Sequence, residues 1–154
     1  AAAIVERVRS YAKGARSERV SSEVSELVNK AVREFKRQSG ERVEVKLTQA
    51  QPVHVIVNPL EFELVIINLL RNAAQALQEL GVSNPKVDLT IRRSDNSAMI
   101  TIEDNGHIEK ETIAKLSEPT NSTKADGLGL GLQIVRSIIE NHGGKISFSP
   151  LPAA

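Results

Sequence analysis

The fold is decided by residues 87–106, which read VDLTIRRSDNSAMITIEDNG. Apolar residues occupy every second position in two runs: Val87, Leu89 and Ile91, then Ala98, Ile100 and Ile102. Alternation over such short runs is typical of strands that bury one face, and Asp95-Asn96 between them has the residue types of a tight turn. The stretch therefore predicts an antiparallel hairpin that turns one side toward a hydrophobic core.

A long helix is predicted immediately before this hairpin. Apolar residues recur at helical spacing from Leu60 to Leu80, with Pro59 where a first turn tolerates it and Gly81 as the stop. The predicted buried stripe of this helix consists of Phe62, Ile66, Leu69, Ala73, Leu77 and Leu80.

The preceding part of the chain predicts one more helix and two strands. Ser21 or Ser22 could cap a helix that ends at Gly40. Its buried stripe would consist of Leu27, Val28, Ala31, Val32 and Phe35. Alternation then predicts strands over Val43–Leu47 and Val53–Val57.

Toward the ends of the chain the pattern is more mixed. Ile4–Tyr11 has helical spacing, Lys13–Ser22 has the composition of a linker, and Gly127–Gly131 predicts a turn that opens a helix over Leu132–Asn141. Further predicted elements are a short helix, Lys110–Leu116, a helix cap at Gly143-Gly144 and a closing strand, Lys145–Phe148. Strands interleaved with helices that cover one face favour an α+β fold: a two-layer α/β sandwich whose sheet is mixed and mostly antiparallel, with about three helices on one face.

Composition restricts the classes of function. The 154 residues suit one domain, and 20 Lys+Arg against 19 Asp+Glu leave a net charge of +1, which gives no overall attraction for nucleic acid or an anionic membrane. The absence of cysteine excludes disulfide scaffolds, thiol catalysis and cysteine-based zinc sites. No apolar run approaches the roughly 18 residues of a membrane span. Because the chain does not begin with Met, we expect a fragment of a longer protein. A cytoplasmic location is the default expectation for a chain without cysteine, and we expect no membrane contact by this fragment.

Two amides in the long helix are candidate ligands. Asn68 and Asn72 lie four residues apart, so both are expected on one side of the helix, roughly opposite the apolar stripe. Neutral amide oxygens suit Mg²⁺ that also binds substrate phosphates, and the neighbouring Arg71 and Gln75 could reach phosphate oxygens. The alternative is an ordinary polar helix surface.

Asp104 continues the inward-facing row of the second hairpin strand. A carboxylate placed there needs a partner, and the exocyclic amino group of adenine would serve. The alternative is that Asp104 caps the turn that begins at Asn105-Gly106 through its own side chain.

Glycines alternate from Gly127 to Gly131 directly before the last predicted helix. Such a stretch lets backbone N–H groups converge on an anion, and a helix N-terminus adds a favourable dipole. It matches neither a P-loop nor a dinucleotide fingerprint, because the required lysine and glycine spacings are missing. A ligand-free hinge is the alternative.

Together these three elements resemble the nucleotide-binding boxes of the GHKL ATPase superfamily, and most closely the catalytic and ATP-binding domain of bacterial sensor histidine kinases. Asn68–Ala76 resembles the N box, Asp104–Gly106 the first glycine box and Asp126–Leu132 the second. The resemblance extends from about Ser21 to Ser149. It implies the end of a dimerisation and phosphotransfer helix plus a linker in residues 1–18, an ATP-binding domain in 19–150 and a tail in 151–154.

The resemblance also implies a role for each motif residue. Asn72 would coordinate Mg²⁺, Asn68 and Arg71 would approach the phosphates of ATP or ADP, and Asp104 would read adenine. Gly127, Gly129 and Gly131 would shape a lid. The implied nucleotide-binding set also includes Gln75, Gly106, Lys124 and Leu132.

The same resemblance implies a kinase without a catalytic residue of its own. Hydrolytic relatives carry a water-activating Glu where this chain has Asn68, so a kinase is favoured over an ATP hydrolase. None of the three histidines, His54, His107 and His142, has a phosphoacceptor context or metal-ligand spacing, and we expect surface or capping roles. The phosphoacceptor helix domain would therefore lie outside this chain, with a response regulator as the parent's partner and the isolated domain a monomer.

Two departures from the family pattern leave a second hypothesis open. After Asp104 the chain runs Asn105-Gly106-His107-Ile108, one residue short and without the second glycine of the box. The phenylalanine-rich box is replaced by SEPTNSTK at residues 117–124, by natural divergence or deliberate solubilisation. These changes would also suit an interaction module that keeps the fold but binds no nucleotide.

Overall fold

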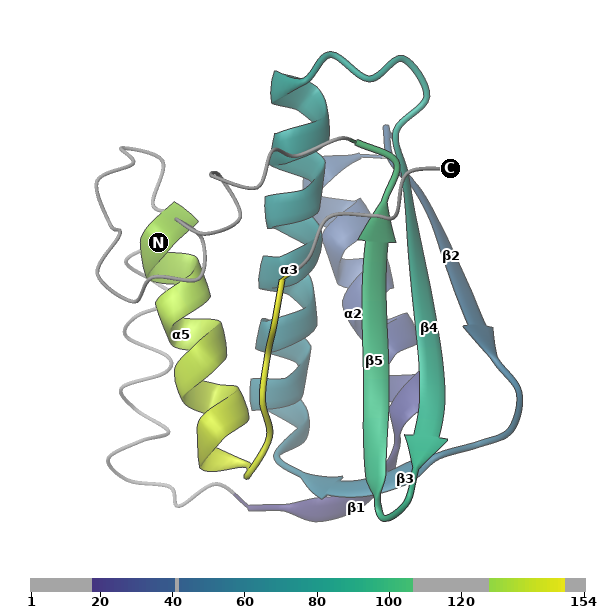
Figure 1. The fold of residues 1–154 in the computed structure, drawn as a ribbon, viewed down its shortest axis with the longest axis vertical. Coiled ribbons are helices and arrows are strands. Elements are labelled where there is room, and N and C mark those ends of the chain that lie inside the picture. The colour runs from purple at the N-terminus through teal and green to yellow at the C-terminus, as the bar shows by residue number, and fades with distance from the viewer. Residues whose placement is uncertain (1–17, 41, 107–127, 149–154) are drawn as a thin grey trace. The chain divides into compact units, whose positions relative to one another are not determined.

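The computed structural model describes residues 18–40, 42–106 and 128–148 (Figure 1). The chain divides into two compact units, Glu18–Gly106 and a second made of residues 1–17 and 107–154. The elements of the first are β1 (Val20–Glu23), α2 (Val24–Ser39), β2 (Glu44–Gln49), β3 (His54–Val57), α3 (Pro59–Glu79), β4 (Lys86–Ser94) and β5 (Ser97–Asp104). The second contributes α5 (Leu128–Asn141). The predicted helices at 4–11 and 110–116 lie outside the described residues.

The predicted hairpin is confirmed as the centre of the first unit. β4 and β5 pair antiparallel around the turn Asp95–Asn96, with Ser94 opposite Ser97, and Asp95 takes the left-handed conformation (φ 53°) that such a turn uses. β2 joins the other side of β4 in parallel, which gives the order β2-β4-β5. β1 and β3 form a separate antiparallel pair.

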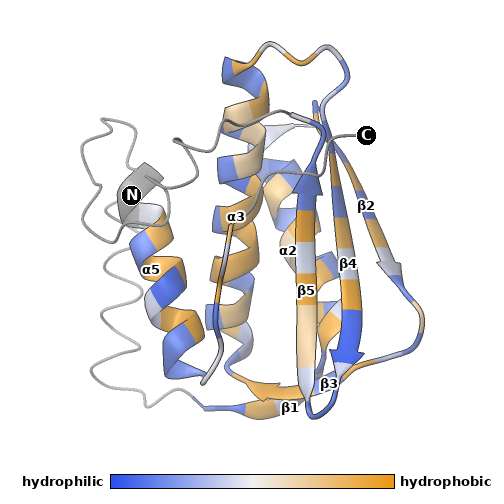
Figure 2. Cartoon of the chain, viewed as in Figure 1, coloured by the Kyte–Doolittle hydropathy of each residue, from blue (hydrophilic) through white to orange (hydrophobic). Residues whose placement is uncertain are grey.

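One face of the three-stranded sheet forms the core. Over the first part of β4, Val87, Leu89 and Ile91 are buried while the residues between them are exposed or half-buried, an alternation visible in the hydropathy colouring of Figure 2. α2 and α3 pack against each other, α2 also contacts β2, and α3 also contacts β5. In this unit the largest fully buried side chains are Phe35, Ile66, Leu70, Leu77, Leu89, Ile91, Val24, Val28 and Val87. Helices on a mixed, mostly antiparallel sheet confirm the predicted α+β class.

The start of α2 corrects the sequence prediction. Residues 20–22, expected to be the end of the linker with a capping serine, form β1 together with Glu23, and Glu23 precedes the helix without a side-chain cap. The cause is tertiary: β1 pairs with β3, and the Val24 amide donates to the Val53 carbonyl at 2.9 Å. The end is as predicted, because Gly40 has φ 79° and donates to the Lys36 carbonyl at 2.8 Å. Of the predicted stripe, Val28, Ala31 and Phe35 are buried, whereas Leu27 and Val32 are half-buried.

The helix α3 begins as predicted but packs more widely. Pro59 is in its first turn, and the side chain of Asn58 caps it by accepting from the Glu61 amide at 2.9 Å. The single apolar stripe is wrong for the middle of the helix, where every residue of 64–68 is buried. It is also wrong at the end, because Leu80 is 51% exposed. A helix that contacts both α2 and β5 buries more than one face.

The helix of the second unit begins earlier than expected but ends at the predicted residue, Asn141. α5 starts four residues early, so Gly129 and Gly131 lie inside the helix instead of in a turn before it. Glycine is conformationally permissive, so its presence does not by itself exclude a helix. The cap is confirmed by Gly143 (φ 76°), and the Gly144 amide donates to the Ile139 carbonyl at 2.9 Å. The predicted closing strand is wrong: residues 145–148 are irregular, since alternation without a hydrogen-bonded neighbour makes no strand.

A search of the described helices finds none with the length and hydropathy needed to cross a bilayer.

Candidate functional site

Asn68 lies inside the helix packing and not on an open polar face. Its side chain is 5% exposed, and its Nδ2 donates to the Leu64 carbonyl one turn earlier at 2.8 Å. The prediction of a polar surface carrying both amides is therefore wrong for Asn68, because α3 is buried all round at this level. A neutral amide with its donor committed to the helix backbone cannot act as a general base.

Asn72, one turn further on, is half-buried and has an unsatisfied donor. Its Nδ2 is shielded from solvent and has no hydrogen-bond partner among the described residues. A buried donor without an acceptor is unfavourable, so such atoms are rare and call for a physical explanation. An oxygen of a bound ligand or a water would complete this environment.

Asp104 occupies the predicted position at the end of β5. Residues in its register on β5 are half-buried, whereas Met99 and Glu103 on the other register are exposed. Its Oδ1 accepts a hydrogen bond from the Gly106 amide at 2.9 Å, so the capping alternative is confirmed. That bond occupies one oxygen only, and a carboxylate has acceptor sites on both.

Gly106 brings this turn against α3. A Cβ at this position would lie 2.9 Å from Cδ2 of Leu77 and 3.0 Å from Cδ1 of Leu80. Leu77 is 1% exposed and belongs to the same helix as Asn72, five residues further on, or about 7.5 Å along the axis. The structure thus brings the Asp104 turn and the Asn72 helix together within one unit.

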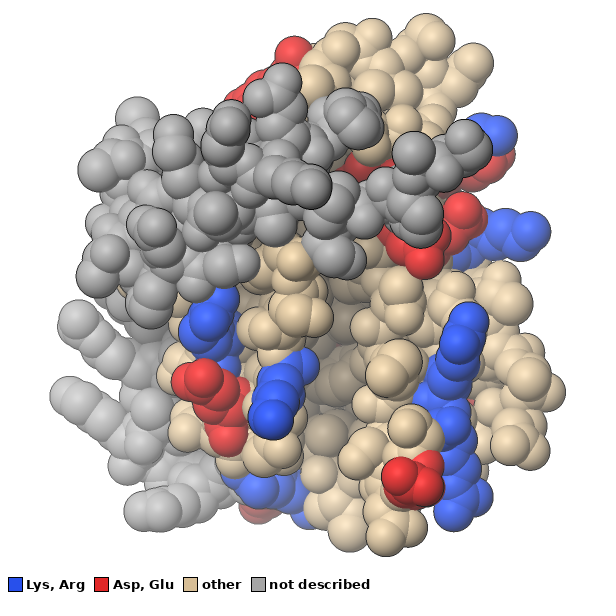
Figure 3. Space-filling view, in the orientation of Figure 1, with Lys and Arg blue, Asp and Glu red and all other residues tan. Residues whose placement is uncertain are grey.

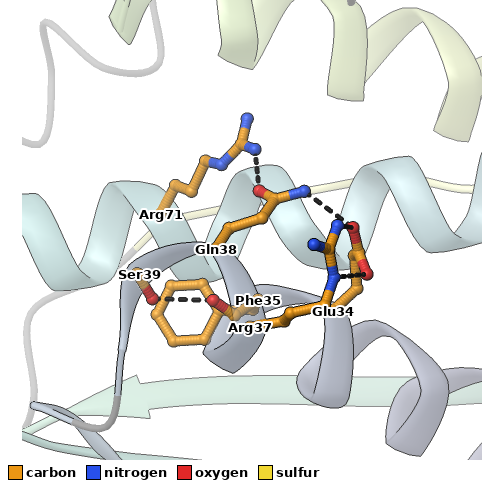
Figure 4. A network of polar contacts seen from close by, with 6 residues as sticks. All are labelled: Glu34, Phe35, Arg37, Gln38, Ser39 and Arg71. Atoms are coloured by element: carbon orange, nitrogen blue, oxygen red, sulfur yellow. Dashed lines mark hydrogen bonds and ion pairs between the residues drawn. The ribbon is translucent and has the colours of Figure 1, made fainter.

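Arg71 is engaged in a polar network that the sequence did not predict (Figure 4). Its guanidinium donates to Oε1 of Gln38 on α2, and Nε2 of Gln38 donates to Glu34 at 3.0 Å. Glu34 is also paired with Arg37 at 2.5 Å, and this hydrogen bond raises the pKa of Arg37. Spacing within one helix could not reveal a bond to a residue 33 positions away. Gln75 lies near Glu79 on α3, with Nε2 3.4 Å from Oε1.

The glycine-rich segment is described only from residue 128 onward. The first N–H groups of a helix lack intrahelical acceptors, so the start of α5, with Gly129 and Gly131, presents backbone donors. Leu132 is 7% exposed. Lys124 and Gly127 lie outside the described residues, as do both departures from the family pattern. That these glycines share a cavity with Asn72 and Asp104 stays a prediction.

The described residues also show how charged side chains and histidines are distributed. Figure 3 shows basic and acidic side chains interspersed on the displayed face. Among the described residues no group of three His, Cys, Asp or Glu side chains is arranged to hold a metal ion. His54 is exposed, and His142 caps α5 by donating from Nδ1 to the Ile138 carbonyl at 2.8 Å, as predicted for these histidines.

Comparison with known proteins identifies the family. Residues 57–153 match the model of the histidine kinase-, DNA gyrase B- and HSP90-like ATPases. The C4-dicarboxylate transport sensor protein DctS of Rhodobacter capsulatus is 31% identical over 96% of this chain, and the sensor protein TdiS of Thauera aromatica is 38% identical over 64%. The chain spans only 23% and 18% of the lengths of these two relatives.

Solved structures agree with the sequence comparisons. The catalytic domain of the histidine kinase ThkA superposes with a TM-score of 0.70 at 27% identity, covering 84% of this chain and 87% of that one. The ATP-binding domain of PrrB from Mycobacterium tuberculosis has the same fold, with a TM-score of 0.66 at 22% identity over 88% of this chain and 89% of that one. The chain therefore belongs to the histidine kinase-, DNA gyrase B- and HSP90-like ATPase family, and within it to the ATP-binding catalytic domains of sensor histidine kinases.

Proposed function

We propose that this domain binds ATP with Mg²⁺ and delivers the γ-phosphate to a histidine on a phosphoacceptor domain that is not part of these 154 residues. The observation that best supports the proposal is the placement of Asp104. Its carboxylate is held by the Gly106 amide in a turn that lies against α3, the helix of Asn68 and Asn72. The carboxylate proposed to recognise the base and the amides proposed to lie near the phosphates are thus on neighbouring elements.

At the adenine end, Asp104 would accept a hydrogen bond from the exocyclic amino group. Its Oδ1 is fixed by the Gly106 amide, so Oδ2 is oriented before a ligand arrives. A hydrogen bond to a charged group contributes about 1.5–3 kcal/mol, and pre-orientation lowers the entropy cost of forming it. A base without an amino group would leave Oδ2 of this half-buried carboxylate without that hydrogen bond.

At the phosphate end, Asn72 is the proposed Mg²⁺ ligand. Mg²⁺ commonly takes one or two protein oxygens together with substrate phosphates, and its charge would offset that of the phosphate oxygens. The amide fits, because its oxygen can face the cation while its unpaired Nδ2 donates to a phosphate oxygen or a water. The other proposed contacts near the phosphates are those of Asn68, Arg71 and Gln75.

The remaining proposed contacts come from the glycine-rich segment. Gly127, Gly129 and Gly131 would supply backbone donors, and Gly106, Lys124 and Leu132 complete the proposed nucleotide-binding set. Donors aimed at transferring phosphoryl oxygens are the main means of catalysis in such reactions.

Transfer to an external histidine agrees with what the chain contains. No histidine of the sequence is followed by an acidic residue, and Asn68 is no water-activating base. The solved complex of the histidine kinase ThkA with the response regulator TrrA matches this chain with a TM-score of 0.66 at 22% identity. We propose a response regulator as partner of the parent protein, a cytoplasmic location and a monomeric isolated domain comprising residues 19–150.

The test is a calorimetric titration of the 154-residue chain with ATP and ADP, with and without Mg²⁺. We expect heat of binding that weakens without Mg²⁺ and is largely lost in Asp104→Asn. A phosphoacceptor domain added in trans with labelled ATP should then gain label. No heat at millimolar nucleotide would favour the nucleotide-free interaction module, and substantial phosphate release by the chain alone would favour a hydrolase.

A further inference from the structure

Asn105 lies between Asp104 and Gly106 and makes three hydrogen bonds to the short segment at the start of β4. Its backbone amide donates to the Lys86 carbonyl at 3.1 Å. Its side chain accepts from the Lys86 amide at 2.9 Å through Oδ1 and donates to the Asn84 carbonyl at 2.7 Å through Nδ2. Both ends of the side-chain amide are therefore used, although the residue is exposed.

The segment that makes these bonds with Asn105 is itself held in place by other backbone hydrogen bonds. It connects α3 to β4, and its start is bonded back to the helix by the Val82 amide, which donates to the Leu77 carbonyl at 3.1 Å. Further along, the Pro85 carbonyl accepts from the Glu44 amide of β2 at 3.0 Å. Asn105 thus attaches the end of β5 to a segment held by both the helix and the sheet.

The turn is consequently held on two sides. On one side Asn105 bonds to Asn84 and Lys86, and on the other Gly106 lies so close to Leu77 of α3 and to Leu80, which follows the helix, that an added Cβ would collide with both. The Gly106 amide in turn holds Oδ1 of Asp104 at 2.9 Å. The position of the carboxylate therefore depends on the backbone path through residue 105.

We propose that Asn105 is a positioning residue for base recognition: its side chain fixes the turn that aims the Asp104 carboxylate, without itself touching the nucleotide. This inference rests on the proposed function. Because the bonded groups of Asn84 and Lys86 belong to backbone at the surface, water can replace the side chain when it is removed. Loss of the side chain therefore affects the placement of Asp104 more than the stability of the fold.

The experiment compares ATP with purine riboside 5′-triphosphate, which lacks only the 6-amino group. The chain, Asn105→Ala, Asn105→Ser and the reference Asp104→Asn are titrated with both ligands. Asn96→Ala is the matched control, because Asn96 is an exposed asparagine in the turn at the opposite end of β5. We expect the parent chain to prefer ATP by at least about tenfold. We expect Asn105→Ala to reduce that preference to within about threefold, Asn105→Ser to retain part of it and Asn96→Ala to leave it unchanged.

A second measurement needs no nucleotide. Hydrogen exchange of the Gly106 amide, followed by NMR, reports its bond to Asp104 and should accelerate in Asn105→Ala but not in Asn96→Ala. Full ATP preference together with unchanged exchange in Asn105→Ala would overturn the inference. If Asp104→Asn keeps the full preference for ATP over the purine analogue, the proposal that Asp104 recognises the base is wrong. This result differs from the one that would overturn the role of Asn105, so the two proposals can be tested separately.

Discussion

The turn at residues 104–106 and the polar network around Arg71 are fixed in different ways. The turn is held by bonds to backbone groups of Asn84 and Lys86 and by close contact with a fully buried leucine. The network consists of long side chains on the surfaces of α2 and α3, joined through Gln38. Bonds between two long exposed side chains contribute little and readjust easily, whereas bonds to fixed backbone groups and contacts with packed side chains readjust less. Base recognition is therefore expected to be rigid, and the phosphate side adaptable.

The largest effect is expected from Asp104→Asn. The amide presents a donor where a carboxylate oxygen now accepts, so ATP affinity should fall by about 2–3 kcal/mol, or roughly 30- to 150-fold. Calorimetry with ATP measures it. A fall in ATP affinity smaller than about threefold would contradict the proposal that the rigid turn at residues 104–106 recognises the base.

Gly106→Ala should both destabilise the domain and weaken ATP binding. The added Cβ would meet Leu77, which is too buried to give way, and would also approach Oδ1 of Asp104. Such overpacking costs about 1–3 kcal/mol of unfolding free energy.

The matched control for this substitution is Gly40→Ala. Gly40 has φ 79° and no neighbouring atom within 4 Å of an added Cβ, so this change strains only a helix end far along the chain. Urea denaturation should show both variants destabilised, while only Gly106→Ala should lose ATP affinity. Equal affinities in the two variants would contradict the role of the close contact.

Gln38→Ala should have a much smaller effect than either substitution. It removes the acceptor for Arg71 but leaves the guanidinium free to adopt other positions, so unfolding free energy should change by less than about 0.5 kcal/mol. ATP affinity should change by less than about threefold. An effect as large as that of Asp104→Asn, measured by the same titration, would show that the network is as rigid as the turn.

The smallest effect concerns Glu23, at the junction of β1 and α2. A hydrogen bond from Ser25 lowers the pKa of Glu23 below its ordinary value. Because the folded-state pKa is lowered, this bond stabilises the fold above the ordinary glutamate pKa, and that stabilisation is lost as pH falls through the lowered value. Urea midpoints of Ser25→Ala and the parent chain should differ slightly at pH 7 and converge in acid, with ATP affinity at pH 7 unchanged. A difference that grows in acid would contradict the assignment.

Local sequence patterns were sufficient for the hairpin, the position of Asp104 and the ends of the helices at Gly40 and Gly143. Each of these depends on alternation or on a glycine conformation within a few residues. Local patterns failed to predict the structure where it depends on residues that are distant in the sequence. β1 exists because β3 pairs with it, and Asn68 is buried because α3 packs on more than one side.

For the same reason, nothing in the sequence pointed to Gln38 as the partner of Arg71. Asn105 was visible as part of the resemblance, but its bonds to Asn84 and Lys86 cross 21 and 19 positions and could not be inferred from spacing. Sequence patterns did not predict the early start of α5, because a glycine-rich stretch usually indicates a loop, although a helix can contain glycine.

Under the proposed function, the bond between Asp104 and the Gly106 amide separates base recognition from phosphate binding along the loop. Since that amide is committed to the carboxylate, it is not available to an incoming phosphate, and backbone donors for phosphate must come from later positions. Substitutions and deletions beyond Gly106, where this chain departs from the family pattern, can then alter how the triphosphate is handled while the choice of base is preserved. Such a division would let related kinases diverge in turnover without losing their preference for adenine.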